Sequence, residues 1–210
     1  MAVKISVADV RIGWTEQQLA LGNGPLLVKL ATNPRNFYSL GPNDPVGPLF
    51  ARIVQDVGSD RIEMLSIFAH GYVVKDSRNA LHGGYGVQFG KDDILVQNAE
   101  ALFAGFKGKC PSGTVGIELV GCEVAARSRV QNGASVEVGD GIALCTQIAK
   151  GADTCVRASP ASQIFATVAE FSKIVSDPTK PLGRGSQTGN VVDPGIWEGN
   201  VWVICKNGRR

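Results

Sequence analysis

The stretch IEMLSIFAHG, residues 62–71, determines how the rest of the chain is interpreted. Its apolar residues run almost without interruption from Met64 to Ala69 and stop at His70 and Gly71. A continuous apolar run of this length is typical of a strand covered on both faces, as in a parallel sheet. The chain has only two histidines, and one of them directly follows this predicted strand.

A second stretch has the same form. TVGIELVGC, residues 114–122, is another apolar run, and it ends in Gly121 and Cys122. The interval from His70 to Cys122 is 52 residues, enough for a loop, a helix and one right-handed crossover back to the sheet. We therefore expect the two strands to be parallel neighbours, with His70 and Cys122 at the same edge.

The remaining pattern alternates between strands and helices. Further strands are expected over residues 24–32, 85–89, 154–159 and 197–208, and residues 4–10 could form another. Helices are expected over residues 48–58, 92–109, 139–152 and 160–177. Their expected caps are Gly58 for the first helix, Asp92 or Asp93 for the second, and Asp140 and Gly151 for the third.

This alternation predicts an α/β fold with a mostly parallel central sheet flanked by helices. We expect one domain over residues 24–210, preceded by an N-terminal extension over residues 1–23. In open sheets of this kind, functional sites form beyond the carboxyl ends of the strands. His70 and Cys122 are predicted at such ends.

Composition and charge exclude several classes of protein. The net charge of +2 gives no electrostatic case for nucleic acid or a membrane surface. No apolar run approaches the roughly 20 residues that span a bilayer, and the N-terminus has no signal-peptide pattern. We expect a cytoplasmic protein without a cofactor, with export by a signal-less route left open.

The five cysteines are irregularly spaced and include no CxxC pair, so a zinc site is not expected. In a reducing compartment most of them should be small buried thiols. The exception is Cys122, because a thiol that meets an imidazole at a strand end can form a nucleophile–base pair. The others are Cys110, Cys145, Cys155 and Cys205.

The His-Gly and Gly-Cys strand ends, in this order and spacing, resemble those of the caspase-like cysteine peptidases. The chain is most similar to a bacterial caspase-like domain found in large surface and repeat proteins. That likeness includes the GDG start of the third helix, residues 139–141, and the strand end at Val156–Ser159. It covers roughly residues 24–175 and implies a caspase-like three-layer sandwich.

The resemblance also implies a mechanism. Cys122 would be the nucleophile, His70 would pass a proton to the leaving amine, and backbone N–H groups of Gly71 and Cys122 would hold the oxyanion. The substrate would be a peptide or protein. Glu123 stands where caspases have Arg, and no S1 residue can be assigned. Residues 123–138 contain no obvious Asp-X cleavage site.

Several alternatives stay open. His82 is the competing base and Cys110 the rival nucleophile, while Asp76, Asp92 and Asp93 are candidates for an S1 pocket but are by default caps or surface residues. The glycine-rich loop 82–90 does not fit a phosphate loop and is expected to line the site or form a hairpin. Loop 178–190 is a connector, a lid over the site, or a segment that the enzyme cuts after Arg184.

The leading hypothesis is a cysteine endopeptidase that uses Cys122 and His70 and can process itself. A caspase-like binding or adaptor module without turnover is the second hypothesis, and a hydrolase of small amides is the third. The oligomeric state cannot be assigned from the sequence.

Overall fold

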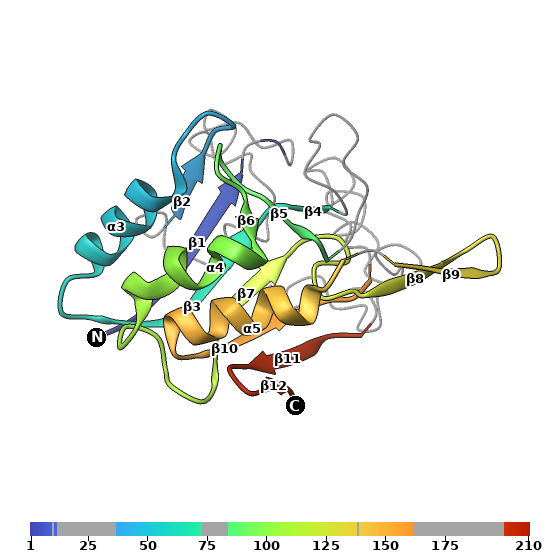
Figure 1. The fold of residues 1–210 in the computed structure, drawn as a ribbon. Helices are drawn as coiled ribbons and strands as arrows, with labels where there is room; N and C mark the ends of the chain where they lie inside the picture. Colours follow the sequence, from blue (N-terminus) through green and yellow to red (C-terminus); the bar gives the residue numbers. More distant parts are fainter. Residues whose placement is uncertain (10, 12–36, 73–83, 138, 162–199) are drawn as a thin grey trace, which may run out of the picture.

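In the part of the chain that the structure describes, the central sheet has seven strands, and the five in the spatial order β2-β1-β3-β7-β10 are parallel. The computed structural model describes residues 1–9, 11, 37–72, 84–137, 139–161 and 200–210. The last two strands, β11 and β12, are antiparallel and form the other edge (Figure 1). The strands are β1 (Ala2–Asp9), β2 (Phe37–Leu40), β3 (Arg61–Phe68), β7 (Val115–Val120), β10 (Cys155–Ala158), β11 (Trp202–Cys205) and β12 (Gly208–Arg209).

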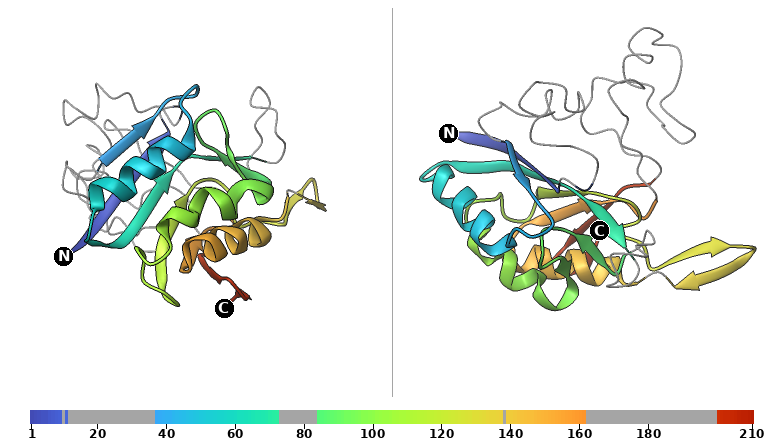
Figure 2. Two further views of the ribbon diagram at one scale, coloured as in Figure 1. Left: turned by 60° about the vertical axis from the view of Figure 1, so that its left-hand side comes forward. Right: turned by 90° about the horizontal axis from the view of Figure 1, so that it is seen from above.

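The described helices all cover one face of this sheet (Figure 2). They are α3 (Val46–Val57), α4 (Val96–Phe103), which continues into a 3₁₀ turn, Ala104–Phe106, and α5 (Gly141–Ala152). The connections from β2 to β3, β3 to β7 and β7 to β10 all advance in the same direction across the sheet. Because such crossovers are right-handed, their helices must lie on the same face.

Two smaller antiparallel units complete the described structure. A three-stranded sheet consists of β4 (His70–Tyr72), β5 (Gly86–Gln88) and β6 (Ile94–Leu95), and it lies within the crossover from β3 to β7. A hairpin of β8 (Ser128–Gln131) and β9 (Ala134–Glu137) follows Cys122 and projects from the body of the molecule (Figure 1). Asn132 and Gly133 at its tip have φ values of 51° and 79°, as a tight hairpin turn requires.

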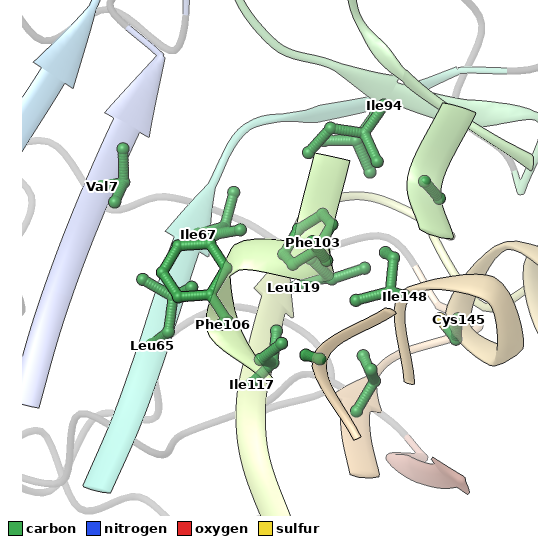
Figure 3. Close-up of a cluster of buried hydrophobic side chains, with 14 of the residues drawn as sticks. Val7, Leu65, Ile67, Ile94, Phe103, Phe106, Ile117, Leu119, Cys145 and Ile148 are labelled. Atoms are coloured by element: carbon green, nitrogen blue, oxygen red, sulfur yellow. The ribbon is translucent and has the colours of Figure 1, made fainter. Parts of the chain in front are cut away.

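The hydrophobic core lies between the sheet and the helices. Alternate strand residues point into it, among them Leu65, Ile67 and Leu119, and they meet Phe103 and Phe106 from the helical layer (Figure 3). Phe50 of α3 lies 5.0 and 5.2 Å from those two rings, measured between centroids, in edge-to-face arrangements. This cluster joins the first two helices to the sheet.

The opposite face of the same strands carries a polar row. Ser6, Ser66, Glu118 and Arg157 stand side by side in the register of β1, β3, β7 and β10. The Ser66 hydroxyl donates to Glu118 Oε2 at 3.0 Å, and Arg157 Nη2 donates to Glu118 Oε1. Ser66 and Glu118 are buried, while the Arg157 side chain is 34% exposed. This polar row was not predicted, because residues 114–122 were expected to form an apolar strand.

The α/β class and the mostly parallel sheet are confirmed, as are the strands predicted around residues 62–69, 114–122 and 154–159. β1 lies inside the sheet between β2 and β3, so its residues belong to the domain and not to the N-terminal extension that was expected. Residues 123–138, for which no strand was predicted, contain the β8–β9 hairpin. The strand at 24–32, the helical residues after 161 and loop 178–190 lie outside the described residues.

The cap predicted for α4 is also wrong. Asp92 and Asp93 do not cap α4, whose first turn is held by the Asn98 side chain accepting from Leu95 N at 2.8 Å. Asp92 accepts instead from Val46 N, the first residue of α3, at 3.0 Å, and Asp93 accepts from Phe89 N at 3.1 Å. Both aspartates therefore join neighbouring segments.

Of the two caps predicted for α5, one is confirmed and the other is wrong. Asp140 caps its start as predicted, accepting from Ala143 N at 3.0 Å. Gly151, however, does not end the helix, which continues to Ala152 and stops at Asp153 in the left-handed conformation. Gly151 is buried against α4, and a Cβ placed on it would lie 2.3 Å from the Glu100 carbonyl oxygen. Its role is close packing between α4 and α5.

The contact between Gly151 and α4 predicts that a methyl group added at Gly151 destabilises the protein, while one added at Gly47 does not. Gly151→Ala should lower the free energy of unfolding by about 1–3 kcal/mol, since the backbone of α4 must shift to admit the Cβ. Gly47→Ala in α3 is the matched control, because nothing lies within 4 Å of its Cβ position. Because Gly47 is exposed at the start of α3, its substitution should change the free energy of unfolding by only about 0.5 kcal/mol or less. Denaturant unfolding of both variants measures the difference, and a stabilising Gly151→Ala would contradict the packing role.

Candidate functional site

His70 lies where the central sheet passes into the small antiparallel sheet. The ladder between β3 and β7 extends one residue beyond β3, because Ala69 N donates to the Val120 carbonyl at 3.1 Å. His70 then begins β4 and pairs with Gln88 of β5. It is half-buried. The chain therefore changes from parallel to antiparallel pairing at His70.

Cys122 follows β7 at the same edge of the sheet. β3 and β7 are parallel neighbours, with Phe68 opposite Val120, so both strands deliver their next residues to one place. Cys122 is 4% exposed. The prediction of two matched, neighbouring strand ends is confirmed, while the roles of the two side chains remain a prediction.

Gly121 brings the two strand ends into direct contact. A Cβ on this residue would lie 2.5 Å from the Ala69 carbonyl oxygen and 3.4 Å from Gly71 N. Any larger residue would push the backbone before Cys122 away from the backbone on both sides of His70. The glycine therefore sets the spacing between the two segments.

The segment after Cys122 is held by main-chain bonds to the segment after β10. Glu123 N donates to the Ala161 carbonyl at 2.9 Å, and Ala125 N donates to the Ser159 carbonyl at 3.0 Å. Glu123 has a φ of 56°, in the left-handed region that non-glycine residues seldom adopt. These bonds fix the main chain that directly follows Cys122.

The His70 ring has a backbone partner that the sequence analysis missed. Its Nε2 lies 3.3 Å from the Arg11 carbonyl oxygen. A carbonyl oxygen can only accept, so this contact favours the tautomer that carries its proton on Nε2 and leaves Nδ1 to exchange protons elsewhere. Arg11 comes shortly after β1, and only the strand order β1-β3-β7 brings it next to His70.

The glycine-rich loop forms part of the site's framework. Gly86 begins β5, so the expected hairpin exists and supports β4. Gly84 forms a bridge with Gly139 at the start of α5, and a Cβ on Gly84 would lie 2.1 Å from the Ala126 carbonyl oxygen. The loop therefore packs against the segment after Cys122. The competing base His82, like Asp76 and Arg184, lies outside the described residues.

Two of the other cysteines are buried thiols with a raised pKa. Cys110, the rival nucleophile, is buried, and burial raises the pKa of its thiol to about 12. Cys145 is buried in α5 as predicted, and burial raises its thiol pKa to about 12 as well. Both thiols stay protonated near neutral pH, when a thiolate is the reactive species.

Cys155 and Cys205, expected to be reduced thiols, form a disulfide between neighbouring strands β10 and β11. The prediction fails because the two residues are 50 positions apart and only strand pairing brings them together. Such bonds are typical of oxidising compartments.

The described residues contain no group of three or more His, Cys, Asp or Glu side chains placed to hold a metal ion. None of the helices in the described ranges is long and apolar enough to cross a membrane.

No family model, curated protein or solved structure matches the chain. The functional interpretation therefore depends on the geometry around His70 and Cys122.

The raised thiol pKa values predict how slowly Cys110 and Cys145 react with iodoacetamide in the native protein. With a pKa of about 12, each has about one thiolate in a thousand molecules at pH 9, and both are buried. Raising the pH from 7 to 9 should leave both unmodified, as read by peptide mass spectrometry. The same protein in denaturant is the control, in which both should react fully. Rapid native labelling of Cys110 at pH 9 would contradict its burial.

The disulfide predicts how many cysteines react with an alkylating reagent before and after reduction. Denatured protein without a reductant should take up three alkyl groups, because two of the five cysteines are bonded to each other. After reduction it should take up five. Five groups without reduction would show that Cys155 and Cys205 are thiols.

Proposed function

We propose that this protein is a caspase-like cysteine endopeptidase with Cys122 as nucleophile and His70 as its proton-transfer partner. The observation that carries the proposal is the backbone contact at Gly121, which joins the segments that end in these two residues. A caspase-like three-layer sandwich is part of the proposal. The parallel sheet and the layer of α3, α4 and α5 on one face would be two of its three layers.

The proposed reaction uses groups at the carboxyl ends of β3 and β7. His70 Nδ1 takes the proton of the Cys122 thiol, and the resulting thiolate attacks the scissile carbonyl carbon. His70 then passes that proton to the leaving amine as the C–N bond breaks, which produces a thioester and a free amino terminus. Water then hydrolyses the thioester with His70 as the base. The Arg11 carbonyl supports this role, because it engages Nε2 and leaves Nδ1 for proton transfer.

The oxyanion of each tetrahedral intermediate would be held by backbone N–H groups of Gly71 and Cys122. Gly71 is buried at the start of the small sheet, and its lack of a Cβ lets a substrate approach the main chain closely. Losing one such donor typically costs about 10²–10³ in rate. The backbone geometry is therefore as important to the proposal as the thiol.

One observation favours the alternative of a binding or adaptor module without turnover. Cys122 exposes only 4% of its surface, which is little for a thiol that must reach a protein substrate. A reactive Cys122 that hydrolyses small amides but no peptides would instead support the small-amide hydrolase.

Substituting the two proposed residues tests the peptidase directly. Cys122→Ala and His70→Gln should each lower kcat/KM on a positional-scanning peptide library at least about 10³-fold, because nucleophile and base act as a unit. Cys110→Ala and His82→Gln are the matched controls and should keep nearly full activity. An inactive Cys110→Ala beside an active Cys122→Ala would mean that the wrong thiol is proposed.

An electrophilic thiol probe separates the alternatives. The peptidase and the amidase both require labelling at Cys122 that His70→Gln slows, and peptide and small-amide substrates then distinguish them. Absence of site-selective labelling at Cys122 in the folded protein would favour the binding module.

A further inference from the structure

Asp9, the last residue of β1, is a buried carboxylate with a complete set of hydrogen-bond donors. Its side chain is 1% exposed. Oδ1 accepts from Arg11 N at 2.9 Å and from Arg11 Nε at 2.8 Å. Oδ2 accepts from Arg11 Nη2 at 2.6 Å and from Gly90 N at 2.8 Å. Four donors from two segments therefore meet on one carboxylate.

Arg11 grips Asp9 through both its backbone and its guanidinium group. The bond from Arg11 N to the Asp9 side chain, two residues earlier, closes a tight turn of the backbone. The guanidinium group also binds both oxygens of the carboxylate, which fixes the orientation of the two side chains. The carbonyl oxygen of this same residue lies 3.3 Å from His70 Nε2. The ion pair thus holds the backbone that carries the acceptor of the His70 ring.

The same pair also holds the strand that supports the His70 backbone. Gly90 N donates to Asp9, and Arg11 Nη2 donates to the Gly90 carbonyl at 2.9 Å, so both main-chain groups of Gly90 are engaged. Gly90 lies two residues after Gln88, the partner of His70 across β4 and β5. Its φ of 56°, and the Asp44 carbonyl 2.5 Å from its Cβ position, exclude larger residues.

From these contacts we propose that the ion pair between the buried Asp9 and the partly buried Arg11 is a positioning device for His70, which holds the ring in the Nε2–H tautomer through the Arg11 carbonyl. An ion pair that buries a carboxylate contributes little net stability compared with apolar residues of similar volume, so the geometry it imposes is the better explanation for it. A role of this ion pair in catalysis rests on the proposed peptidase. The expected tautomer of His70 does not, because it follows from the contact with the Arg11 carbonyl alone.

The ring nitrogens report the tautomer directly in 15N NMR, because protonated and unprotonated imidazole nitrogens have widely separated shifts. The chain has two histidines, so His82→Gln assigns the His70 signals without ambiguity. In this background, at a pH where the ring is neutral, His70 should show a protonated Nε2 and an unprotonated Nδ1. No substrate or activity is needed for this measurement.

Two variants weaken the device in different ways. Arg11→Lys keeps the charge but loses the forked contact, and Asp9→Asn removes the charge and turns one acceptor into a donor. Both should move the two His70 nitrogen shifts toward a common average as the tautomers mix. Asp56→Asn is the matched control, since Asp56 is an exposed acid paired with Arg52 at 3.6 Å, and it should leave the His70 shifts unchanged.

If Asp9→Asn does not fold, the double variant Asp9→Asn/Arg11→Gln replaces the ion pair by two amides of similar shape and should give the same averaging. In active protein, Arg11→Lys should lower kcat roughly 10- to 100-fold while KM stays unchanged. Averaged shifts in a protein whose Cys122 is unreactive would support the positioning device and contradict only the peptidase.

A proton on Nδ1 of His70 in the parent protein would overturn the proposal. So would a single Nε2–H tautomer that persists in folded Arg11→Lys and in either folded Asp9 variant.

Discussion

The parallel pairing of β3 with β7 is the constraint on which the candidate site depends. Both strands run in the same direction, so their carboxyl ends coincide, and Gly121 allows the main chains beyond them to touch. His70, Gly71 and Cys122 all follow from this one alignment. A shift of one residue in the register would turn the strand side chains to the opposite faces and separate the strand ends.

The two faces of the same strands have different chemistry. One face packs its branched side chains against the phenylalanines of α3 and α4 and accounts for most of the buried core (Figure 3). The other carries the buried Glu118, which pairs with the partly exposed Arg157 beside Ser66. A buried carboxylate tolerates little displacement of its partner, because breaking the pair leaves an uncompensated charge. The polar row therefore favours one register of β3, β7 and β10.

Buried polar contacts also link the site to the first strand. β1 lies next to β3, at the point where the strand order reverses, and open α/β sheets form their sites beyond the carboxyl ends at such points. Asp9 and Arg11 occupy that position and connect β1 to the segment after β5. The candidate site thus includes residues from the beginning of the chain, which a boundary at residue 24 would have left out.

What the sequence by itself determined is local. The apolar runs ending at His70 and Cys122, the helix that begins after Asp140 and the α/β class follow from periodicity and capping, which neighbouring residues decide. The tertiary structure alone decided that Asp92 holds α3, that Gly151 packs on α4, that Cys155 bonds to Cys205 and that Arg11 faces His70. The reason is physical: each of these contacts joins residues far apart in sequence, and strand order and register, which no local pattern encodes, bring them together.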